Sequence, residues 1–299
     1  MKKTAIALAR EDKVFITLVY VIGALLLLLV AYPLVYVLSA SFSDPMEVIS
    51  GRVILWPRCL SLRAYQEVFK SSNILLGLFN TFCYTIAGTA INVLMTTLAA
   101  YPLSRKDMAG HNVITMFITF TMFFSGGMIP TFLTIKSLGL LNTFWVMVLP
   151  PAISVTNLLI MRNYFQYSVP GEIIEAAYID GCSNVATLLR VVVPISRSIF
   201  GVMLIYYFVG HWNSYMSALL YLNDSGRYPL QVFLRQILLQ NSLSDMASGS
   251  SGDAAVDVAL LTETLKYAII VVASVPALII YPFMQKFFAA GIMIGSLKG

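Results

Sequence analysis

The sequence predicts an all-α integral membrane protein with six transmembrane helices. Of its 299 residues, 59% are hydrophobic and 11% are charged, and the mean hydropathy is +0.82. A soluble domain carries about 25% charged residues. Six apolar segments are also long enough, at about 1.5 Å per helical residue, to cross a hydrocarbon core of roughly 30 Å. Each is expected to be helical, because backbone exposed to lipid must satisfy its own hydrogen bonds.

The six spans are placed around uncharged apolar runs, near residues 14–38, 78–103, 113–135, 141–162, 198–222 and 265–286. The first follows a basic stretch, residues 1–13, and exceeds the roughly 7–15 apolar residues of a signal peptide, so we expect a retained signal-anchor helix. In the third, Gly126-Gly127 followed by Pro130 predicts a kink or an unwound turn. The spans and their connections, residues 14–299, form one transmembrane domain.

The distribution of basic residues predicts the orientation. With the N-terminus placed in the cytoplasm, the short inside segments carry more of the 19 Lys and Arg residues than the long outside loops do. Both termini are therefore expected in the cytoplasm of a multi-pass protein. The segment 223–263 becomes an external loop, and its Ser/Gly/Asp-rich part, 242–257, is typical of a linker.

Cysteines and net charge exclude several classes of site. Cys59, Cys83 and Cys182 lack CxxC spacing, so neither a disulfide framework nor a zinc site is predicted. The net charge of +5 is explained by placement beside a membrane rather than by nucleic acid. We expect no catalytic and no metal-binding residues.

The segment 166–197 is a polar island between the fourth and fifth spans, and its residues predict two short amphipathic helices. Pro170 suits the first turn of a helix, and Glu172 and Glu175 lie near the positive N-terminal end. Gly181 then stops this helix, because glycine adopts the left-handed conformation at low cost.

The second helix of the island begins at Ser183, which can cap its N-terminus, and is closed by Pro194 before the fifth span. Two amphipathic helices joined at a glycine will lie on lipid headgroups, pack under the bundle or dock into a groove of a partner protein. The residues alone leave these alternatives open.

The island also resembles a known signature. Glu175-Ala176-Ala177, three residues, Gly181, nine residues and Val191-Val192-Val193-Pro194 are similar to the EAA loop of bacterial ABC-importer permeases, with valines at 191 and 193 where isoleucine and leucine are usual. In that family the loop forms coupling helices that sit in a cleft of the ATP-hydrolysing subunit. The resemblance implies these ATPase-coupling residues: Glu172, Glu175, Ala176, Ala177, Asp180, Gly181 and Pro194.

Six spans with this loop between the fourth and fifth resemble the carbohydrate-uptake, maltose permease MalG-like family and the type I importer fold. The stretch around His211-Trp212-Asn213, Tyr228-Pro229-Leu230 and the tail 287–299 resemble the same family, and the first of these is similar to the LplC/YtcP-like branch. That branch is associated with oligosaccharides, uronide-containing ones included.

The resemblance further implies an assembly in the bacterial cytoplasmic membrane. Its partners are a second permease in a heterodimer, an ABC ATPase dimer that uses ATP and Mg, and an extracytoplasmic solute-binding protein that meets the loop 223–263. No cofactor is implied in this chain. In agreement, no GxxxxGK[ST] phosphate loop occurs in the sequence, so ATP hydrolysis by that route needs a separate polypeptide.

Embedded polar residues are the candidates for the substrate path: Asn92, Asn157, His211 and Asn213. Polar groups in a span usually face the bundle interior or an aqueous path, although each of these also suits a hydrogen bond that joins two helices. Trp212, near the outer end of its span, is interpreted as an interfacial anchor.

Two other classes of function stay open. A stand-alone secondary transporter or channel needs intramembrane charges for ion coupling, and the cores of the six spans contain no Asp or Glu. An intramembrane enzyme would need a set of catalytic residues close together, and His211 has no carboxylate or metal-ligand partner at helical spacing. An anionic substrate would favour positive charge along the path, yet the span cores also lack Lys and Arg.

Overall fold

The computed structural model describes residues 10–247 and 263–282, and the regular structure of this part is helical, without β-strands. The chain divides into two compact units. One comprises Met1–Lys70 and Ile237–Val272, and the other comprises Ser71–Gln236 and Ala273–Gly299.

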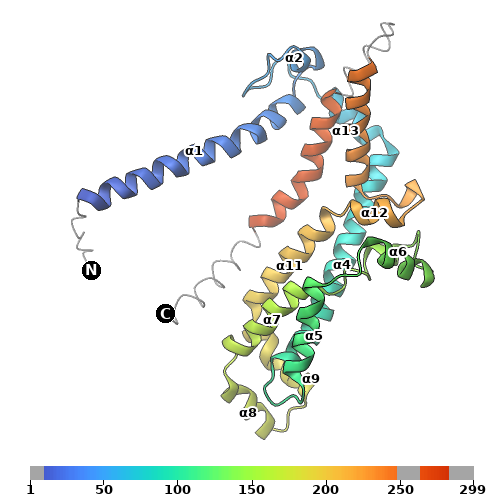
Figure 1. The fold of residues 1–299 in the computed structure, drawn as a ribbon. Coiled ribbons are helices and arrows are strands. Elements are labelled where there is room, and N and C mark those ends of the chain that lie inside the picture. The colour runs from blue at the N-terminus through green and yellow to red at the C-terminus, as the bar shows by residue number, and fades with distance from the viewer. Residues whose placement is uncertain (1–9, 248–262, 283–299) are drawn as a thin grey trace. The chain divides into compact units, whose positions relative to one another are not determined.

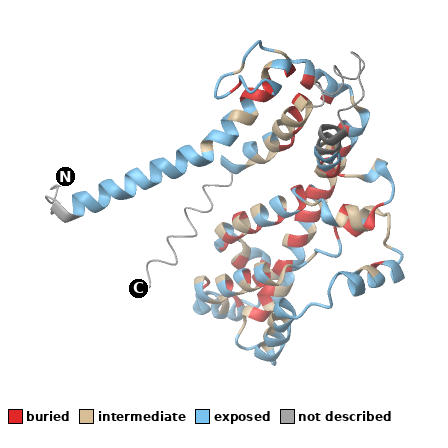
Figure 2. Ribbon diagram, turned by 45° about the horizontal axis from the view of Figure 1, so that its top comes forward, coloured by how far each residue is buried: buried red, intermediate tan, exposed pale blue. Residues whose placement is uncertain are grey.

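The first unit begins with the long helix α1 (Arg10–Ser41), which covers the predicted span 14–38 and is exposed along nearly its whole length (Figure 2). Two short helices, α2 (Pro45–Ile49) and α3 (Arg63–Lys70), follow. Serines at the end of α1 fasten the intervening loop: Ser39 Oγ donates to Leu55 O at 2.5 Å, and Ser43 Oγ accepts from Arg58 N at 3.0 Å. The segment 41–70 is therefore a folded cap rather than an open loop.

The second unit is organised around α4 (Ser72–Ser104), against which α11 (Arg197–Trp212) and α7 (Val155–Ser168) pack (Figure 1). The face of α4 that these helices cover carries small and hydroxyl side chains, which let backbones approach closely. The buried members are Thr85, Thr89, Asn92, Thr96, Thr97 and Ala100, whereas Thr81 accepts a hydrogen bond from Leu230 N. A cluster of apolar side chains from α4, α7 and α11 continues this core, Met161 and Met203 among them.

Four further helices of this unit are α5 (His111–Phe123), α6 (Met128–Ser137), α12 (Met216–Tyr221) and α13 (Leu230–Ala247), the last of which continues into the first unit. Helices α5 and α6 meet at 113°. The bend falls at Phe124–Gly127, where Gly127 has φ +88°, so the unwound turn predicted at Gly126-Gly127 is confirmed.

The predicted fourth span, 141–162, is wrong as a single helix. A 3₁₀ turn covers Phe144–Met147, the backbone is not helical from 148 to 154, and α7 then runs from Val155 to Ser168. The cause is Pro150-Pro151, because proline lacks an N–H and disfavours helix in the residue before it. Helix α7 is about 21 Å long, which is short of a hydrocarbon core of roughly 30 Å.

The other expected spans fare differently. Asp12–Ser41, Ser72–Ser104 and Glu263–Pro282 are long and apolar enough to cross a membrane, and counting each bent helix pair as one span raises the total to five within the described residues. The predicted fifth span, 198–222, is α11 and α12 with a break between them. Six spans therefore stay a prediction. The segment expected to be a loop, 223–263, contains the helix α13. We did not predict this helix, although the segment contains several Leu, Ile and Val residues.

Some predictions lie outside the described residues. These are most of the N-terminal segment 1–13, the later part of the Ser/Gly/Asp-rich tract 242–257, the last residues of the span 265–286 and the tail 287–299.

Candidate functional site

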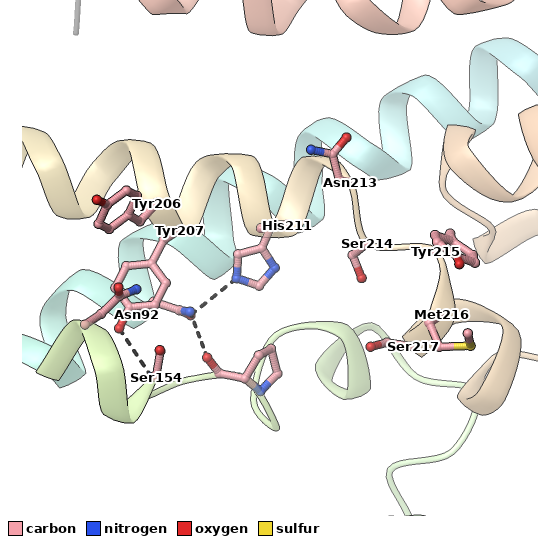
Figure 3. Close-up of a pocket in the computed structure, with 13 residues that line it drawn as sticks. Asn92, Ser154, Tyr206, Tyr207, His211, Asn213, Ser214, Tyr215, Met216 and Ser217 are labelled. Carbon is pink, nitrogen blue, oxygen red and sulfur yellow. Dashed lines mark hydrogen bonds between the residues drawn. The ribbon is translucent and has the colours of Figure 1, made fainter. Parts of the chain in front are cut away.

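A cavity of about 410 Å³ lies between α4, α11, the non-helical segment before α7 and the break after α11 (Figure 3). The residues that line it are mostly polar or aromatic, and none of them is Asp, Glu, Lys or Arg. They are Asn92, Pro151, Ser154, Asn157, Tyr206, Tyr207, Gly210, His211, Asn213, Ser214, Tyr215, Met216 and Ser217. Amides, hydroxyls and aromatic rings bind a ligand through hydrogen bonds and ring contacts.

Asn92 on α4 is the centre of the cavity's hydrogen bonds. It is 2% exposed, and its Nδ2 donates to Pro151 O at 2.8 Å. Its Oδ1 lies 3.4 Å from His211 Nε2, a long contact drawn in Figure 3. The break at Pro150-Pro151 leaves carbonyls without helical donors, and a buried carbonyl without a partner is costly. Asn92 therefore stabilises the break that shapes this wall.

Tyr207 ties the beginning of α7 to α4. Its hydroxyl lies 2.6 Å from Thr96 Oγ1, which is fully buried, and accepts a hydrogen bond from Ser154 N at 3.4 Å. Tyr207 and His211 are four residues apart on α11, so they present to one side of that helix. Sequence reasoning missed Tyr207 and Ser154, although this spacing from His211 was a usable signal.

The absence of a side chain at Gly88 leaves the space that the His211 ring occupies. A Cβ atom at Gly88 would lie 2.4 Å from both His211 Cε1 and His211 Nε2, closer than real side chains approach. His211 itself is 7% exposed. The imidazole therefore occupies the space that a side chain at position 88 would fill, and the two helices approach closely at this point.

All four residues predicted for the substrate path line this one cavity. Asn92 and His211 are buried and contact each other, Asn157 is half-buried on α7, and Asn213 is exposed at the end of α11. Asn92 and His211 both line the cavity and also join α4 to α11, so the two alternatives hold together for these residues. Their part in transport stays a prediction.

Trp212 is not in the position expected of an interfacial anchor. Its side chain is 2% exposed, its Nε1 donates to Ala273 O at 2.9 Å, and its ring stacks on Phe208 with centroids 5.6 Å apart. The indole N–H therefore has a buried acceptor, the Ala273 carbonyl, and the sequence did not indicate that these two groups would meet.

The second candidate site is the helix pair, defined here as Pro170–Ile195. Its first helix, α8 (Gly171–Ile179), begins after Pro170 and stops as predicted, with Gly181 at φ +77°. Gly181 N donates to Tyr178 O, and Cys182 N donates to Ala177 O, both at 2.9 Å. These two bonds form a Schellman motif, which satisfies the last carbonyls of a helix and requires a left-handed residue.

The second helix begins where Ser183 predicts it. Ser183 Oγ accepts from Ala186 N at 3.3 Å, at the start of α9 (Asn184–Thr187). One π turn (Leu188–Val192) and α10 (Val193–Ile195), which contains Pro194, complete it before an 86° bend into α11. The helix pair is thus joined directly to a helix that lines the cavity.

The helix pair leaves large apolar side chains uncovered. Ile179 is 87% exposed, Val185 is 66% exposed and Leu189 is 61% exposed, whereas Leu188 and Val192 are buried in the core of the unit. Glu172, Glu175, Ala176, Asp180 and Gly181 are exposed as well, and Ala177 is buried. Ile179, Val185 and Leu189, called the tip below, are large apolar side chains exposed on one short segment, and such side chains are typical of a surface that another protein covers.

Comparison with known proteins gives consistent matches. The family described as "Binding-protein-dependent transport system inner membrane component" matches residues 92–294. The polygalacturonan/rhamnogalacturonan transport system permease protein YtcP of Bacillus subtilis is 41% identical, over 97% of this chain and 100% of its own length. Protein LplC of the same organism is 40% identical, over 93% of this chain and 91% of its own.

One solved structure is also similar along nearly the whole chain. It is a chain of a bacterial ABC transporter involved in the import of the acidic polysaccharide alginate, with a TM-score of 0.85 and 30% sequence identity. The match covers 95% of this chain and 100% of that one.

Proposed function

Since the chain belongs to the family of binding-protein-dependent transport system inner membrane components and is an ABC importer permease, we propose that it imports acidic oligosaccharides. The observation that supports import driven by a partner ATPase is the placement of two surfaces on one unit. A helix pair with an uncovered apolar tip leads directly into α11, and α11 lines an uncharged polar cavity.

The uncovered tip supports an ATPase as the occupant of the helix pair. Exposed Ile179, Val185 and Leu189 would be stabilised by burial in a cleft, at about 25 cal/mol per Å² of apolar area removed from water. In this proposal Glu172, Glu175, Ala176, Ala177, Asp180, Gly181 and Pro194 form the coupling loop. ATP and Mg act in the separate ATPase dimer, and this chain carries no cofactor.

The proposed topology has six spans, with both termini and the helix pair on the cytoplasmic side of the bacterial inner membrane. The segments α5–α6 and 141–162 then count as one span each, although neither is a single straight helix. Broken helices within a membrane are tolerated where protein or a water-filled cavity surrounds the freed backbone. The contact between Asn92 and Pro151 supports this interpretation at the second break.

The proposed mechanism is alternating access. An external solute-binding protein delivers the sugar near 223–263, ATP closes the ATPase dimer, and the helix pair transmits that closure to the spans of this chain and of a second permease. Asn92, Asn157, His211 and Asn213 are the groups proposed to bond sugar hydroxyls. No covalent chemistry is assigned to this chain.

The acidic class of substrate rests on the relatives' names and on one nearby cation. YtcP is named for polygalacturonan and rhamnogalacturonan, and the similar structure belongs to an importer of alginate, so all three named polymers contain uronic acids. The cavity lining itself has no charge. The guanidinium of Arg235 on α13 lies 5.9 Å from the ring centroid of Tyr215, which lines the cavity, and would supply positive charge beside it.

The proposal is tested by reconstitution. The tagged chain is purified with the proteins that accompany it, placed in proteoliposomes and assayed for uptake of labelled trigalacturonate in the presence of the binding protein. We expect an ATPase and a second permease to co-purify, and uptake to require hydrolysable ATP. Uptake by this chain alone without ATP would instead establish a secondary transporter or channel. Equal uptake of maltotriose would contradict the acidic substrate class.

A further inference from the structure

A single arginine joins the helix pair to the end of α4. Arg105 directly follows α4, and its side chain is 12% exposed. Its Nε and Nη2 donate to the two carboxylate oxygens of Asp107 at 2.8 and 2.5 Å. This bidentate pair fixes the plane of the guanidinium, since two parallel bonds to a carboxylate define its orientation.

The remaining nitrogen of that guanidinium contacts two different elements. Arg105 Nη1 donates to Tyr101 Oη on α4 at 3.2 Å and to Asn184 Oδ1 at the start of α9 at 3.1 Å. The guanidinium carbon also lies 4.8 Å from the ring centroid of Tyr178 on α8, within cation–π range. The hydroxyl of Tyr178 donates to the same Asn184 oxygen. Both helices of the pair therefore meet at one cation.

Apolar packing joins the same segments independently of Arg105. Leu188 and Val192 of the helix pair lie in the cluster that contains Tyr101 and Leu103 of α4. Loss of the arginine therefore leaves the unit a core by which to fold. The arginine contributes a fixed geometry, because its planar guanidinium donates in set directions and holds α8, α9 and α4 in one relative orientation.

Helix α4 also carries the cavity's central residue. Asn92 and Arg105 are thirteen residues apart, about 20 Å along a helix. A displacement of the helix pair that is held at Arg105 is therefore applied to the same helix that positions Asn92 and its bond to Pro151.

We propose that Arg105 is a positioning residue that locks both helices of the pair to α4, so that ATPase closure moves the cavity wall. This inference rests on the proposed function. It assigns to the Arg105–Asp107–Tyr178–Asn184 cluster the transmission of force, and to the exposed tip of the pair only the attachment of the ATPase.

The test measures sugar imported per ATP hydrolysed in proteoliposomes that contain the full complex, with trigalacturonate as the probe. Arg105→Gln and, separately, Asn184→Leu should lower this ratio by about tenfold while ATP hydrolysis continues, because bonds to a charged donor are lost. Asn184→Asp keeps the acceptor oxygen and should restore a normal ratio. A purely structural role would lower assembly, uptake and hydrolysis together.

The matched control is Arg162→Gln. Arg162 lies on α7, and its Nε donates to Leu103 O at 3.2 Å, so it joins α7 to the same end of α4. Its ratio should stay normal. A normal ratio in both Arg105→Gln and Asn184→Leu would overturn this inference and leave the proposed function intact. Absence of ATP-driven uptake by the unaltered complex would overturn the proposed function, and this inference with it.

Discussion

The cavity and the helix pair share α4 and α11 but differ in how far their chemistry is completed within the chain. In the cavity, Asn92, His211 and Tyr207 are buried, and each contacts another polar group of the same unit. At the helix pair the apolar side chains of Ile179 and Val185 remain mostly exposed. The polar groups of the cavity therefore bond to one another within the chain, whereas the exposed apolar side chains of the helix pair are left for another protein to cover.

This difference separates two kinds of mutational effect. Changes at the exposed tip should affect assembly with the ATPase and spare the permease fold, because little of the unit's own packing is lost there. Changes at the cavity should affect both stability and transport, because the same hydrogen bonds serve both.

The largest effect is expected at the tip. Ile179→Asp places a charge where the proposed cleft is apolar, and desolvating it should prevent docking of the ATPase. We expect uptake to be abolished and the ATPase to be absent from the purified complex, with membrane insertion unchanged. Ile179→Leu is the control and should behave like the unaltered chain. Normal ATPase recovery with Ile179→Asp would show that the tip faces something else.

A smaller loss is expected at the hinge of the helix pair. Gly181 has φ +77° and no atom within 4 Å of an added Cβ, so a substitution there costs backbone strain and not crowding. Gly181→Val should cost about 1–2 kcal/mol and lower uptake roughly tenfold, whereas Gly181→Asn, which tolerates this conformation, should retain most of it. Equal uptake by the two variants would separate transport from the geometry of the hinge.

Within the cavity, Gly88→Ala should displace His211 from Asn92. The clash predicts a loss of about 1–3 kcal/mol in stability, as for other overpacked cores, and a lower rate of uptake. Thermal unfolding of the detergent-solubilised complex gives the first quantity. Adding His211→Ala to Gly88→Ala should recover the stability, and failure to do so would assign the loss to another contact of position 88.

Arg235 offers a test of substrate class with a modest effect. Arg235→Gln should raise KM for trigalacturonate about three- to tenfold through loss of one favourable charge, and should leave KM for its methyl ester unchanged. Arg235→Lys should fall between. A shift in KM of the same size for both compounds would mean that Arg235 acts through the structure of the cavity mouth.

The smallest effect concerns pH. The hydrogen bonds from Arg105 hold the pKa of Asp107 below its ordinary value. Because folding lowers the pKa of Asp107, the ionised carboxylate stabilises the folded state at every pH above its ordinary pKa of about 3.9. This stabilisation is lost as the pH falls through the lowered pKa of the folded state. The carboxylate is 66% exposed, so this contribution is small.

We therefore expect the sugar-to-ATP ratio to be unchanged by this group from about pH 6 to about pH 8. Asp107→Asn should lower the ratio slightly at every pH in that interval. A strong acid-side loss that Asp107→Asn abolishes would contradict the lowered pKa.

Sequence reasoning succeeded where the determining contacts are local. The stop at Gly181 and the cap at Ser183 involve residues within five positions of each other, so residue type and spacing suffice to predict them. The bond between Asn92 and His211 spans 119 positions, and only polar character marked these residues as candidates. That both line one cavity depends on how α4 and α11 pack, which no single-sequence pattern contains.

Two misses have identifiable physical causes. Counting apolar residues placed a continuous helix over 141–162, although Pro150-Pro151 already argued against it. Arg105 entered the sequence analysis only as one of the 19 Lys and Arg residues whose distribution predicts the orientation. Its bond to Asn184, 79 positions away, makes it the junction of three helices.

The most direct test of the central claim is whether events at the helix pair change access to the cavity. Ser217 lines the cavity, and the three native cysteines can be replaced so that Ser217→Cys carries the sole thiol. Its reaction with an impermeant maleimide added outside is measured in the full complex, with and without a non-hydrolysable ATP analogue and the binding protein. We predict faster labelling with the nucleotide, and loss of this acceleration in Arg105→Gln, which is expected to keep the ATPase in the complex. Equal labelling rates in the presence and absence of nucleotide would contradict the proposed transmission from helix pair to cavity.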